Sequence, residues 1–340
     1  MIFLTNFPSF YKINLYNKLY KKKKFKVIFL GKTSKFRDKH FSKFSFSFSS
    51  RFAFNKHYED RNKIISILNT LYLLYNSKSN KIILTGWNEV EYWLALLFIF
   101  RQKILILETN LNYTKKSIFK ILLKKIFLFF INKVLVCGKS QIQLLKYLNF
   151  KKKIVISNGV GLINRNHKLK KNNIANYKKN FLYIGRLEQE EKNVLWLVNF
   201  FKKNTEYKLS LVGNGSLKAK ITKEIKNSNN ISIYKNVVND KLKTHYLGNS
   251  FLILPSLREA WGLVVEEAFH YGKPVIVSKY CGVAELVKNN VNGYVFDPKN
   301  DSLIKILKKI TNKNFKKMSR ELLKSPINND NQQVKAYLNL

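Results

Sequence analysis

Two glutamates flank a glycine at the start of a predicted helix in the second half of the chain. Glu259 precedes Gly262, and Glu267 follows it on the second turn of the helix. The first amides of a helix have no partner within it and carry the positive end of its dipole, so they can bind a phosphate. Carboxylates are poor phosphate ligands but good acceptors for sugar hydroxyls. The stretch therefore predicts a site for a phosphorylated sugar.

A diphosphate also needs cations, and the loops upstream of this helix carry them. Arg186 follows Gly185 directly after a predicted strand, and Lys192 precedes the next helix. Arginine can bind phosphate oxygens with its fork of N–H groups, and lysine adds a point charge. Asn214 lies between two glycines after the following strand, where a tight turn lets the backbone approach a ligand. Because these loops all follow strands of one domain, we expect them to converge at one edge of a parallel sheet.

Short apolar runs alternate with helical patterns along the whole chain, which is typical of parallel α/β units. We predict two doubly wound, Rossmann-like domains that face a cleft. The predicted parts are an N-terminal acceptor-side domain, a polar linker, a donor domain and a C-terminal tail that could return to the first domain, over residues 1–160, 161–180, 181–320 and 321–340. The predicted strands are residues 2–4, 25–30, 81–85, 104–107, 133–136, 154–156, 181–184, 208–212, 231–234, 251–254 and 274–278.

Three further segments carry separate expectations. Basic and aromatic residues interleave over residues 32–55, which we interpret as a long loop. Residues 117–131 mix lysines with large apolar side chains, and a helix that faces the core is favoured slightly over one that docks on a membrane, although both hold if the lysines face anionic lipid. Glu266 is expected to be a solvated neighbour of Glu267.

The net charge is +43, because 63 lysines and arginines stand against 20 aspartates and glutamates. Only eight of these cations are arginines and they do not cluster, so the composition argues against a protein that reads nucleic-acid sequence. A lysine-rich surface would still bind an anionic membrane or another polyanion at low salt. The longest apolar stretches, residues 92–100 and 126–131, are too short to span a membrane.

Metal and disulfide chemistry have little support in the sequence. The two cysteines, Cys137 and Cys281, cannot form a disulfide framework or a Cys-x-x-Cys site, which fits a reducing cytoplasm. Neither an Asp-x-Asp motif nor a cluster of histidine and cysteine is present. We therefore predict no metal and no bound cofactor.

An ordered set of motifs covers about residues 181–298. It comprises Gly185-Arg186-Leu187 with Lys192-Asn193, residues 211–215, Pro255-Ser256, Glu259, Glu267-Ala268, residues 272–275, residues 285–287 and Asn292-Gly293. In this set the second half resembles the donor-binding domain of a retaining glycosyltransferase of family four, which has the GT-B fold. The resemblance implies transfer of a hexose from a nucleoside-diphosphate sugar, a co-substrate rather than a cofactor, to a hydroxyl group.

The resemblance also implies roles for single residues. Arg186 and Lys192 would hold the diphosphate and stabilise the leaving group, with Glu259 positioning the transferred sugar and Glu267 binding the ribose hydroxyls. The remaining donor contacts would come from residues that act through the backbone or line the loops: Gly185, Asn214, Val237, Val238, Gly262, Leu263 and Val264. Asn236 stands where the family usually has a glycine, which does not affect the main-chain contact to the base expected near Val237.

The first half matches the family less well. The family often has a histidine near the reacting bond, and the corresponding place after residues 104–107 holds Glu108. The acceptor is expected to be a glycan or a lipid-linked molecule in cell-surface polysaccharide synthesis, at the cytoplasmic face of a membrane. Two alternatives remain open: a GT-B sugar-nucleotide epimerase or hydrolase, and a polyanion-binding protein with a vestigial donor fold.

Overall fold

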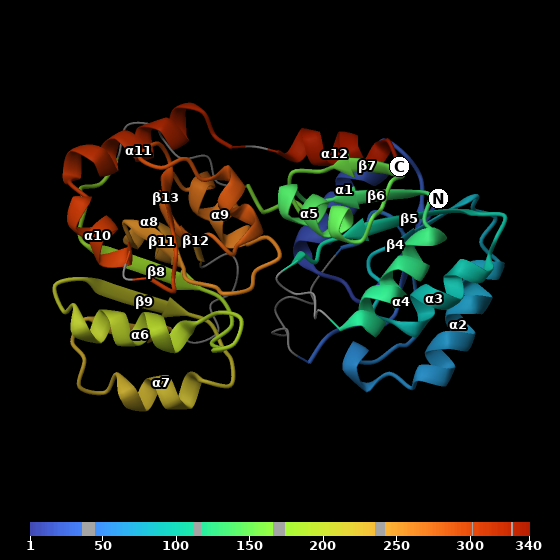
Figure 1. The fold of residues 1–340 in the computed structure, drawn as a ribbon, viewed down its shortest axis with the longest axis horizontal. Coiled ribbons are helices and arrows are strands. Elements are labelled where there is room, and N and C mark those ends of the chain that lie inside the picture. The colour runs from blue at the N-terminus through green and yellow to red at the C-terminus, as the bar shows by residue number, and fades with distance from the viewer. Residues whose placement is uncertain (36–44, 112–116, 166–173, 235–241, 301, 328) are drawn as a thin grey trace. The chain divides into compact units, whose positions relative to one another are not determined.

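A computed structural model describes residues 1–35, 45–111, 117–165, 174–234, 242–300, 302–327 and 329–340 (Figure 1). The chain divides into two compact units, one formed by residues 1–164 with 329–340 and the other by residues 165–328. Among the described residues, no helix is long and apolar enough to cross a membrane.

The first unit is built on a seven-stranded parallel sheet in the order β3-β2-β1-β4-β5-β6-β7. Its strands are β1 (Ile2–Thr5), β2 (Lys26–Phe29), β3 (Ser49–Phe52), β4 (Lys81–Leu84), β5 (Gln102–Leu107), β6 (Lys133–Val136) and β7 (Lys153–Ile156). Its helices are α1 (Phe10–Tyr20), α2 (Lys63–Tyr75), α3 (Val90–Leu94), α4 (Ile118–Phe129), α5 (Lys139–Tyr147) and α12 (Asp330–Leu338), with 3₁₀ turns η2 (Tyr58–Asp60) and η3 (Ala95–Leu97).

Alternate strand residues point to opposite sides of this sheet, so apolar side chains lie on both of its faces. Helices cover both faces. On one face, Tyr16 of α1 and Tyr337 of α12 pack against Phe3, with ring centroids 4.8 and 6.4 Å away. On the other face, Leu74 of α2, Tyr92 of α3 and Phe127 of α4 share one apolar cluster. The last helix of the chain is therefore part of the core of the first unit.

The second unit has a six-stranded parallel sheet in the order β10-β9-β8-β11-β12-β13. Its strands are β8 (Asn180–Ile184), β9 (Lys208–Val212), β10 (Ile231–Tyr234), β11 (Phe251–Leu254), β12 (Val275–Ser278) and β13 (Gly293–Phe296). Its helices are α6 (Val194–Lys203), α7 (Lys218–Glu224), α8 (Leu242–Gly248), α9 (Leu263–His270), α10 (Ser302–Lys309) and α11 (Asn312–Lys324), with the 3₁₀ turn η6 (Gly282–Leu286). The predicted fold class, two doubly wound α/β domains, is confirmed.

Two sequence-based expectations about the first unit are wrong. Residues 32–55 are not one long loop, because β3 pairs with β2 and Phe48 is buried in the core; residues 36–44 lie outside the described residues. Helix α4 does not turn most of its apolar side chains to the core. It buries only Phe127 and Leu128, and large apolar residues on the rest of its surface are exposed.

Candidate functional site

The loops after β8 and β9 are held together backbone to backbone. The amide of Leu187 donates to the carbonyl oxygen of Asn214 (2.9 Å), and the amide of Gly185 donates to that of Val212 (3.1 Å). A Cβ atom on Gly213 would lie 1.9 Å from the carbonyl oxygen of Gly185, so only glycine fits there. The residues predicted to converge on this edge of the sheet, Gly185, Arg186 and Asn214, therefore lie on neighbouring loops.

Arg186 is paired with two carboxylates of its own loop. Its Nη1 lies 2.7 Å from Glu188 Oε2 and its Nη2 lies 2.6 Å from Glu191 Oε2. Burial opposes the charge, but the two carboxylates outweigh it and hold the pKa of Arg186 above its usual value. The guanidinium is half-exposed, so its partners can be exchanged for those of an anionic ligand.

Lys192 and Glu259 form an ion pair between the loop that precedes α6 and the loop that follows β11. Both side chains are largely buried. The same two loops are joined through the backbone, since the amide of Leu257 donates to the carbonyl oxygen of Glu191 (2.8 Å). The sequence predicted both residues of the pair but not that they would contact each other.

Helix α9 begins next to this pair. Gly262 precedes it with φ of +116°, a conformation that strongly favours glycine, and its side-chain position faces Val283 and Leu254. No side chain caps the first turn, in which Leu263 and Val264 lie. An uncapped helix N-terminus at the carboxyl edge of a parallel sheet is suited to an anion.

Glu267 lies on α9 one turn further on, half-buried. Tyr246 of α8 donates to it, with Tyr246 Oη 2.6 Å from Glu267 Oε2. Burial raises the pKa of Glu267 to about 7, and the hydrogen bond from Tyr246 opposes that rise. Tyr246 was not predicted; it lies 21 residues away in sequence, and no local pattern links it to the glutamate.

One prediction about this helix is wrong. Glu266 is not solvated; it is buried and accepts a hydrogen bond of 2.6 Å from Trp261 Nε1. The indole N–H needs a partner in the core, and the carboxylate supplies it. Val237 and Val238, predicted to contact the base, lie outside the described residues, as does Asn236.

The carboxyl edge of the first sheet carries a different set of contacts. Glu108, where a histidine was expected from the resemblance, follows β5 and forms an ion pair with the buried Lys12 of α1. Burial opposes the charge of Lys12, but Glu108 outweighs it, so the pKa of Lys12 stands well above its usual value. Tyr92 donates to Asn6 after β1 and lies 3.1 Å from the hydroxyl of Thr85 after β4.

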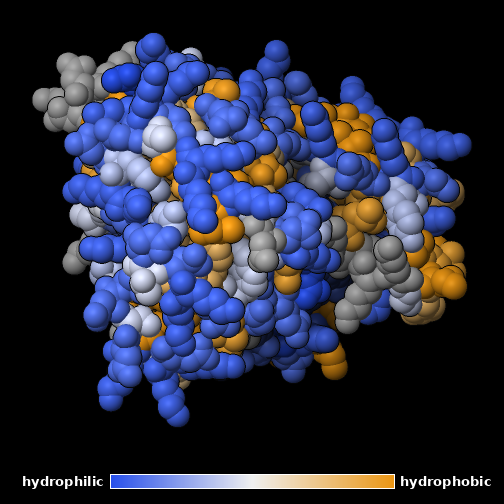
Figure 2. Space-filling view, turned by 60° about the vertical axis from the view of Figure 1, so that its left-hand side comes forward, coloured by the Kyte–Doolittle hydropathy of each residue, from blue (hydrophilic) through white to orange (hydrophobic). Residues whose placement is uncertain are grey.

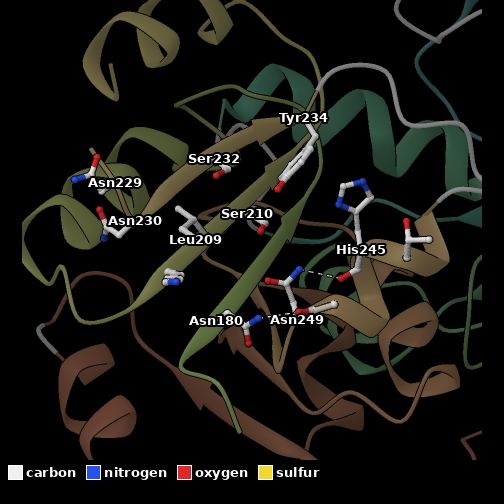
Figure 3. A pocket seen from close by; sticks show the side chains of 12 residues that line it. Asn180, Leu209, Ser210, Asn229, Asn230, Ser232, Tyr234, His245 and Asn249 are labelled. Atoms are coloured by element: carbon white, nitrogen blue, oxygen red, sulfur yellow. Dashed lines mark hydrogen bonds between the residues drawn. The ribbon is translucent and has the colours of Figure 1, made fainter. Parts of the chain in front are cut away.

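A pocket of about 500 Å³ lies elsewhere in the second unit (Figure 3). Its lining comes from residues in and next to β8, β9, β10 and α8, and is rich in asparagine and serine: Asn180, Ser210, Asn229, Asn230, Ser232 and Asn249. None of the described residues predicted to bind the donor lines it. In the part of the chain that the structure describes, no group of three or more histidine, cysteine, aspartate or glutamate side chains could hold a metal ion.

Comparison with known proteins places this geometry in a family. The family model described as glycosyl transferases group 1 matches residues 164–330. Residues 164–330 belong to this family. An uncharacterized protein from the cps region of Klebsiella pneumoniae is 30% identical over 148 residues, 41% of this chain and 40% of that protein. An uncharacterized glycosyltransferase of Methanocaldococcus jannaschii is 30% identical over 132 residues, 37% of this chain and 34% of that protein. Each match thus spans about two fifths or less of the relative.

Solved structures of glycosyltransferases share the fold over the whole chain. A glycosyltransferase from Rickettsia africae aligns with a TM-score of 0.71 at 17% identity, covering 99% of this chain and 96% of that one. Anabaena HepE in complex with UDP-glucose aligns with a TM-score of 0.70 at 13% identity, covering 100% and 99%. The lipopolysaccharide outer core galactosyltransferase WaaB aligns with a TM-score of 0.67 at 15% identity, covering 100% and 99%. The chain therefore has the GT-B fold.

Proposed function

We propose that this protein is a glycosyltransferase that moves a hexose from a nucleoside-diphosphate sugar to a hydroxyl of a glycan or lipid-linked acceptor, with retention at the anomeric carbon and without a metal. One observation carries the proposal: two cations, a carboxylate and an uncapped helix N-terminus lie at one edge of the second sheet. These are Arg186, Lys192, Glu259 and the start of α9.

The diphosphate would bind between the cations and the helix. Arg186 would exchange Glu188 and Glu191 for phosphate oxygens, and Lys192 would turn from Glu259 to the phosphate next to the sugar. The amides of Leu263 and Val264 would take further oxygens. These donors would stabilise the charge that develops on the leaving diphosphate, which lowers the barrier to transfer.

The carboxylates would bind the two sugars of the donor. Glu259, once released from Lys192, would accept hydroxyls of the transferred hexose, and Glu267 would accept those of the ribose. In the transfer step the bond from the anomeric carbon to the leaving phosphate breaks, and the acceptor oxygen bonds to that carbon on the same face. The leaving phosphate takes the acceptor proton, so no pair of hydrolase carboxylates is required.

Two similar structures support the donor and acceptor classes. HepE is similar in fold and was solved with UDP-glucose, and WaaB acts on the outer core of lipopolysaccharide. By analogy with them, we propose a nucleotide sugar as the donor of this chain and a cell-surface glycan as its acceptor. The base, the sugar and the linkage are open to experiment.

Thermal unfolding of the purified chain with UDP-, GDP-, ADP- and dTDP-sugars tests the donor site. A ligand that binds only the folded state stabilises it by about 2.7 kcal/mol at a hundredfold excess over its dissociation constant. We expect one nucleotide to raise the midpoint, Arg186→Ala to reduce that shift, and Arg320→Ala on α11 to leave it unchanged. Arg320 is exposed in the same unit, so this control removes the same charge.

Three outcomes would contradict the proposal in whole or in part. If none of the four nucleotides shifts a folded protein, and DNA or heparin stabilises it instead in a salt-sensitive way, the chain is a polyanion-binding protein. If a donor binds but is epimerised or hydrolysed when no acceptor is present, at the rate seen with acceptor, the chain is not a transferase. Loss of activity in EDTA that Mn²⁺ restores would contradict the metal-independent mechanism.

A further inference from the structure

Helix α2 turns a row of large apolar side chains away from the sheet that it covers. The residues that it buries are Ser66, Thr70 and Leu74, two of which are hydroxyl-bearing. The exposed large apolar residues recur one helical turn apart along the opposite face: Ile64, Leu68, Tyr72 and Tyr75. This is the reverse of the pattern expected for a helix whose outer face meets water.

Helix α4 repeats the arrangement on the same face of the sheet. Its exposed apolar residues have the same spacing, with one more beside them: Ile118, Phe119, Leu122, Ile126 and Phe129. Ile118 is 86% exposed, although it is among the most apolar residue types. Two separate helices of one unit therefore present an apolar stripe outward.

The turn between η3 and β5 adds exposed apolar residues next to the end of α2. Phe100 is 98% exposed, and Leu97 and Ile99 beside it are exposed as well. Arg101 fixes this turn to the end of α2, because its Nη1 donates to the carbonyl oxygen of Leu74 at 2.6 Å. We call the residues of α2, of 97–100 and of α4 just described the apolar surface.

Contacts inside the first unit connect α4 to the same layer. Trp93 of α3 packs edge-on against Phe127 of α4, with ring centroids 5.0 Å apart, and α3 packs against α2. Figure 1 shows α2, α3 and α4 side by side on one side of this sheet. The exposed large apolar residues are thus grouped on neighbouring elements of one layer, unlike the scattered apolar residues normal for a protein surface.

The exposed charges on the two helices of the apolar surface are positive. Lys63, Lys120 and Lys125 are exposed on its helices, and neither helix contains an acidic residue. Between Asp60 and Glu188 the sequence holds three acidic residues, and side chains contact each of them: Glu89 and Glu91 meet Arg61, and Glu108 meets Lys12. Figure 2 shows apolar patches set in a surface that is otherwise mostly hydrophilic.

We propose that the apolar surface docks on an anionic lipid bilayer. Its apolar side chains would enter the boundary between headgroups and acyl chains, while the surrounding lysines would contact anionic headgroups. A second copy of this chain is the less suitable occupant, because both copies would bring positive charge to the contact. This surface is separate from the donor site and does not depend on the proposed transfer reaction.

Co-sedimentation with lipid vesicles tests the proposal. We expect the protein to bind vesicles of phosphatidylcholine with about 30% phosphatidylglycerol, to bind phosphatidylcholine alone weakly, and to be partly released by about 0.5 M NaCl. Combining Leu68→Ser, Phe100→Ser and Ile118→Ser should reduce the partition coefficient about tenfold or more, since each change removes an apolar side chain from the contact. Phe100→Ser alone, which removes one exposed aromatic side chain, should reduce the partition coefficient roughly threefold.

Matched variants separate this surface from general stickiness and charge. Tyr147→Ser, Leu247→Ser and Val291→Ser together remove three exposed apolar residues outside the apolar surface and should leave vesicle binding unchanged. Lys120→Gln with Lys125→Gln should weaken binding, whereas Lys220→Gln with Lys223→Gln on α7 should weaken it far less for the same loss of charge.

Three results would overturn the proposal. One is that the folded wild-type protein fails to bind anionic vesicles. Another is that the apolar and control triple variants bind equally well. The third is a concentration-dependent dimer, seen by light scattering, that the apolar triple variant abolishes, since the surface would then join two copies. The donor-dependent thermal shift should be the same in every variant, so failure here is distinguishable from failure of the proposed function.

Discussion

The two units share one architecture but differ in how far backbone and side-chain contacts hold the loops at their sheet edges. In the second unit, backbone lies against backbone at positions where a Cβ atom would collide with a carbonyl oxygen: 1.9 Å at Gly213, 2.5 Å at Gly215 and 2.2 Å at Gly282. The first unit has such a position too, since a Cβ atom on Gly161 would lie 2.7 Å from the carbonyl oxygen of Tyr11, but it adds side-chain connections, through Lys12 with Glu108 and Tyr92 with Asn6.

This difference of degree fits the place where the sequence matches a family. A backbone contact that excludes Cβ can be made by glycine alone, so such an edge has a recognisable motif. An ion pair or hydrogen bond can be built from several residue types at several positions. The family match covers residues 164–330, whereas the solved structures share the fold of both units at low identity.

The largest effect is expected where the backbone contact is tightest. In Gly213→Ala the new methyl group would clash with the carbonyl oxygen of Gly185, at 1.9 Å, so the loops after β8 and β9 must separate. We expect the free energy of unfolding to fall by about 4 kcal/mol, measured by urea denaturation, or the second unit to fail to fold.

Gly248→Ala at the end of α8 is the matched control. No atom lies within 4 Å of the added Cβ, and the change in unfolding free energy should stay within about 0.5 kcal/mol. If Gly213→Ala is as mild as this control, the proposed contrast between backbone and side-chain connections does not hold.

An intermediate effect is expected from the ion pair of the first unit. Lys12→Met leaves Glu108 without its cation at a largely enclosed site, and we expect a loss of about 2 kcal/mol in unfolding free energy. Adding Glu108→Gln removes the stranded charge and should recover about half of that loss, which distinguishes the pair from simple packing of the lysine.

Lys18→Met on the same helix provides the comparison for this pair. Lys18 lies 3.7 Å from Asp330 with its side chain well exposed, so its removal should cost no more than about 0.5 kcal/mol. Equal losses for Lys12→Met and Lys18→Met would mean that the edge of the first sheet does not depend on its buried pair.

The sequence predicted the fold well where the strands are continuous apolar runs. Residues 208–212 and 251–254 were predicted as strands with the bounds that β9 and β11 have. Strand β3 was missed because Phe52 is its only apolar residue and the strand lies at the sheet edge, where burial is slight. Helix α12 gave no local signal for its place, since its packing against Phe3 depends on contacts across the whole chain.

The sequence predicted that the candidate residues converge at the carboxyl edge of the second sheet, but it did not predict which of them form ion pairs with each other. Loop spacing after successive parallel strands brings Arg186, Lys192 and Glu259 to one edge. Which carboxylate meets which cation depends on side-chain packing between loops 67 residues apart, as in the pair of Lys192 with Glu259. The functional roles of these residues remain predictions.

The smallest effect is expected where the second unit does use side-chain pairs. Glu188→Gln with Glu191→Gln removes the two carboxylates that hold Arg186, and a donor diphosphate no longer has to displace them. Because these pairs are partly exposed, we expect a gain of about 1 kcal/mol, or about fivefold tighter binding of the nucleotide sugar by titration calorimetry.

Glu190→Gln is the control for charge, since Glu190 lies in the same loop, is almost fully exposed and contacts Arg258 at 3.4 Å. One Glu190→Gln change should tighten binding little, because distant exposed charges are screened. Weaker binding in the Glu188→Gln and Glu191→Gln variant would show that the carboxylates orient Arg186 for the diphosphate rather than compete with it. The side-chain contacts at this edge would then hold the site in its binding geometry, as the backbone contacts beside them do.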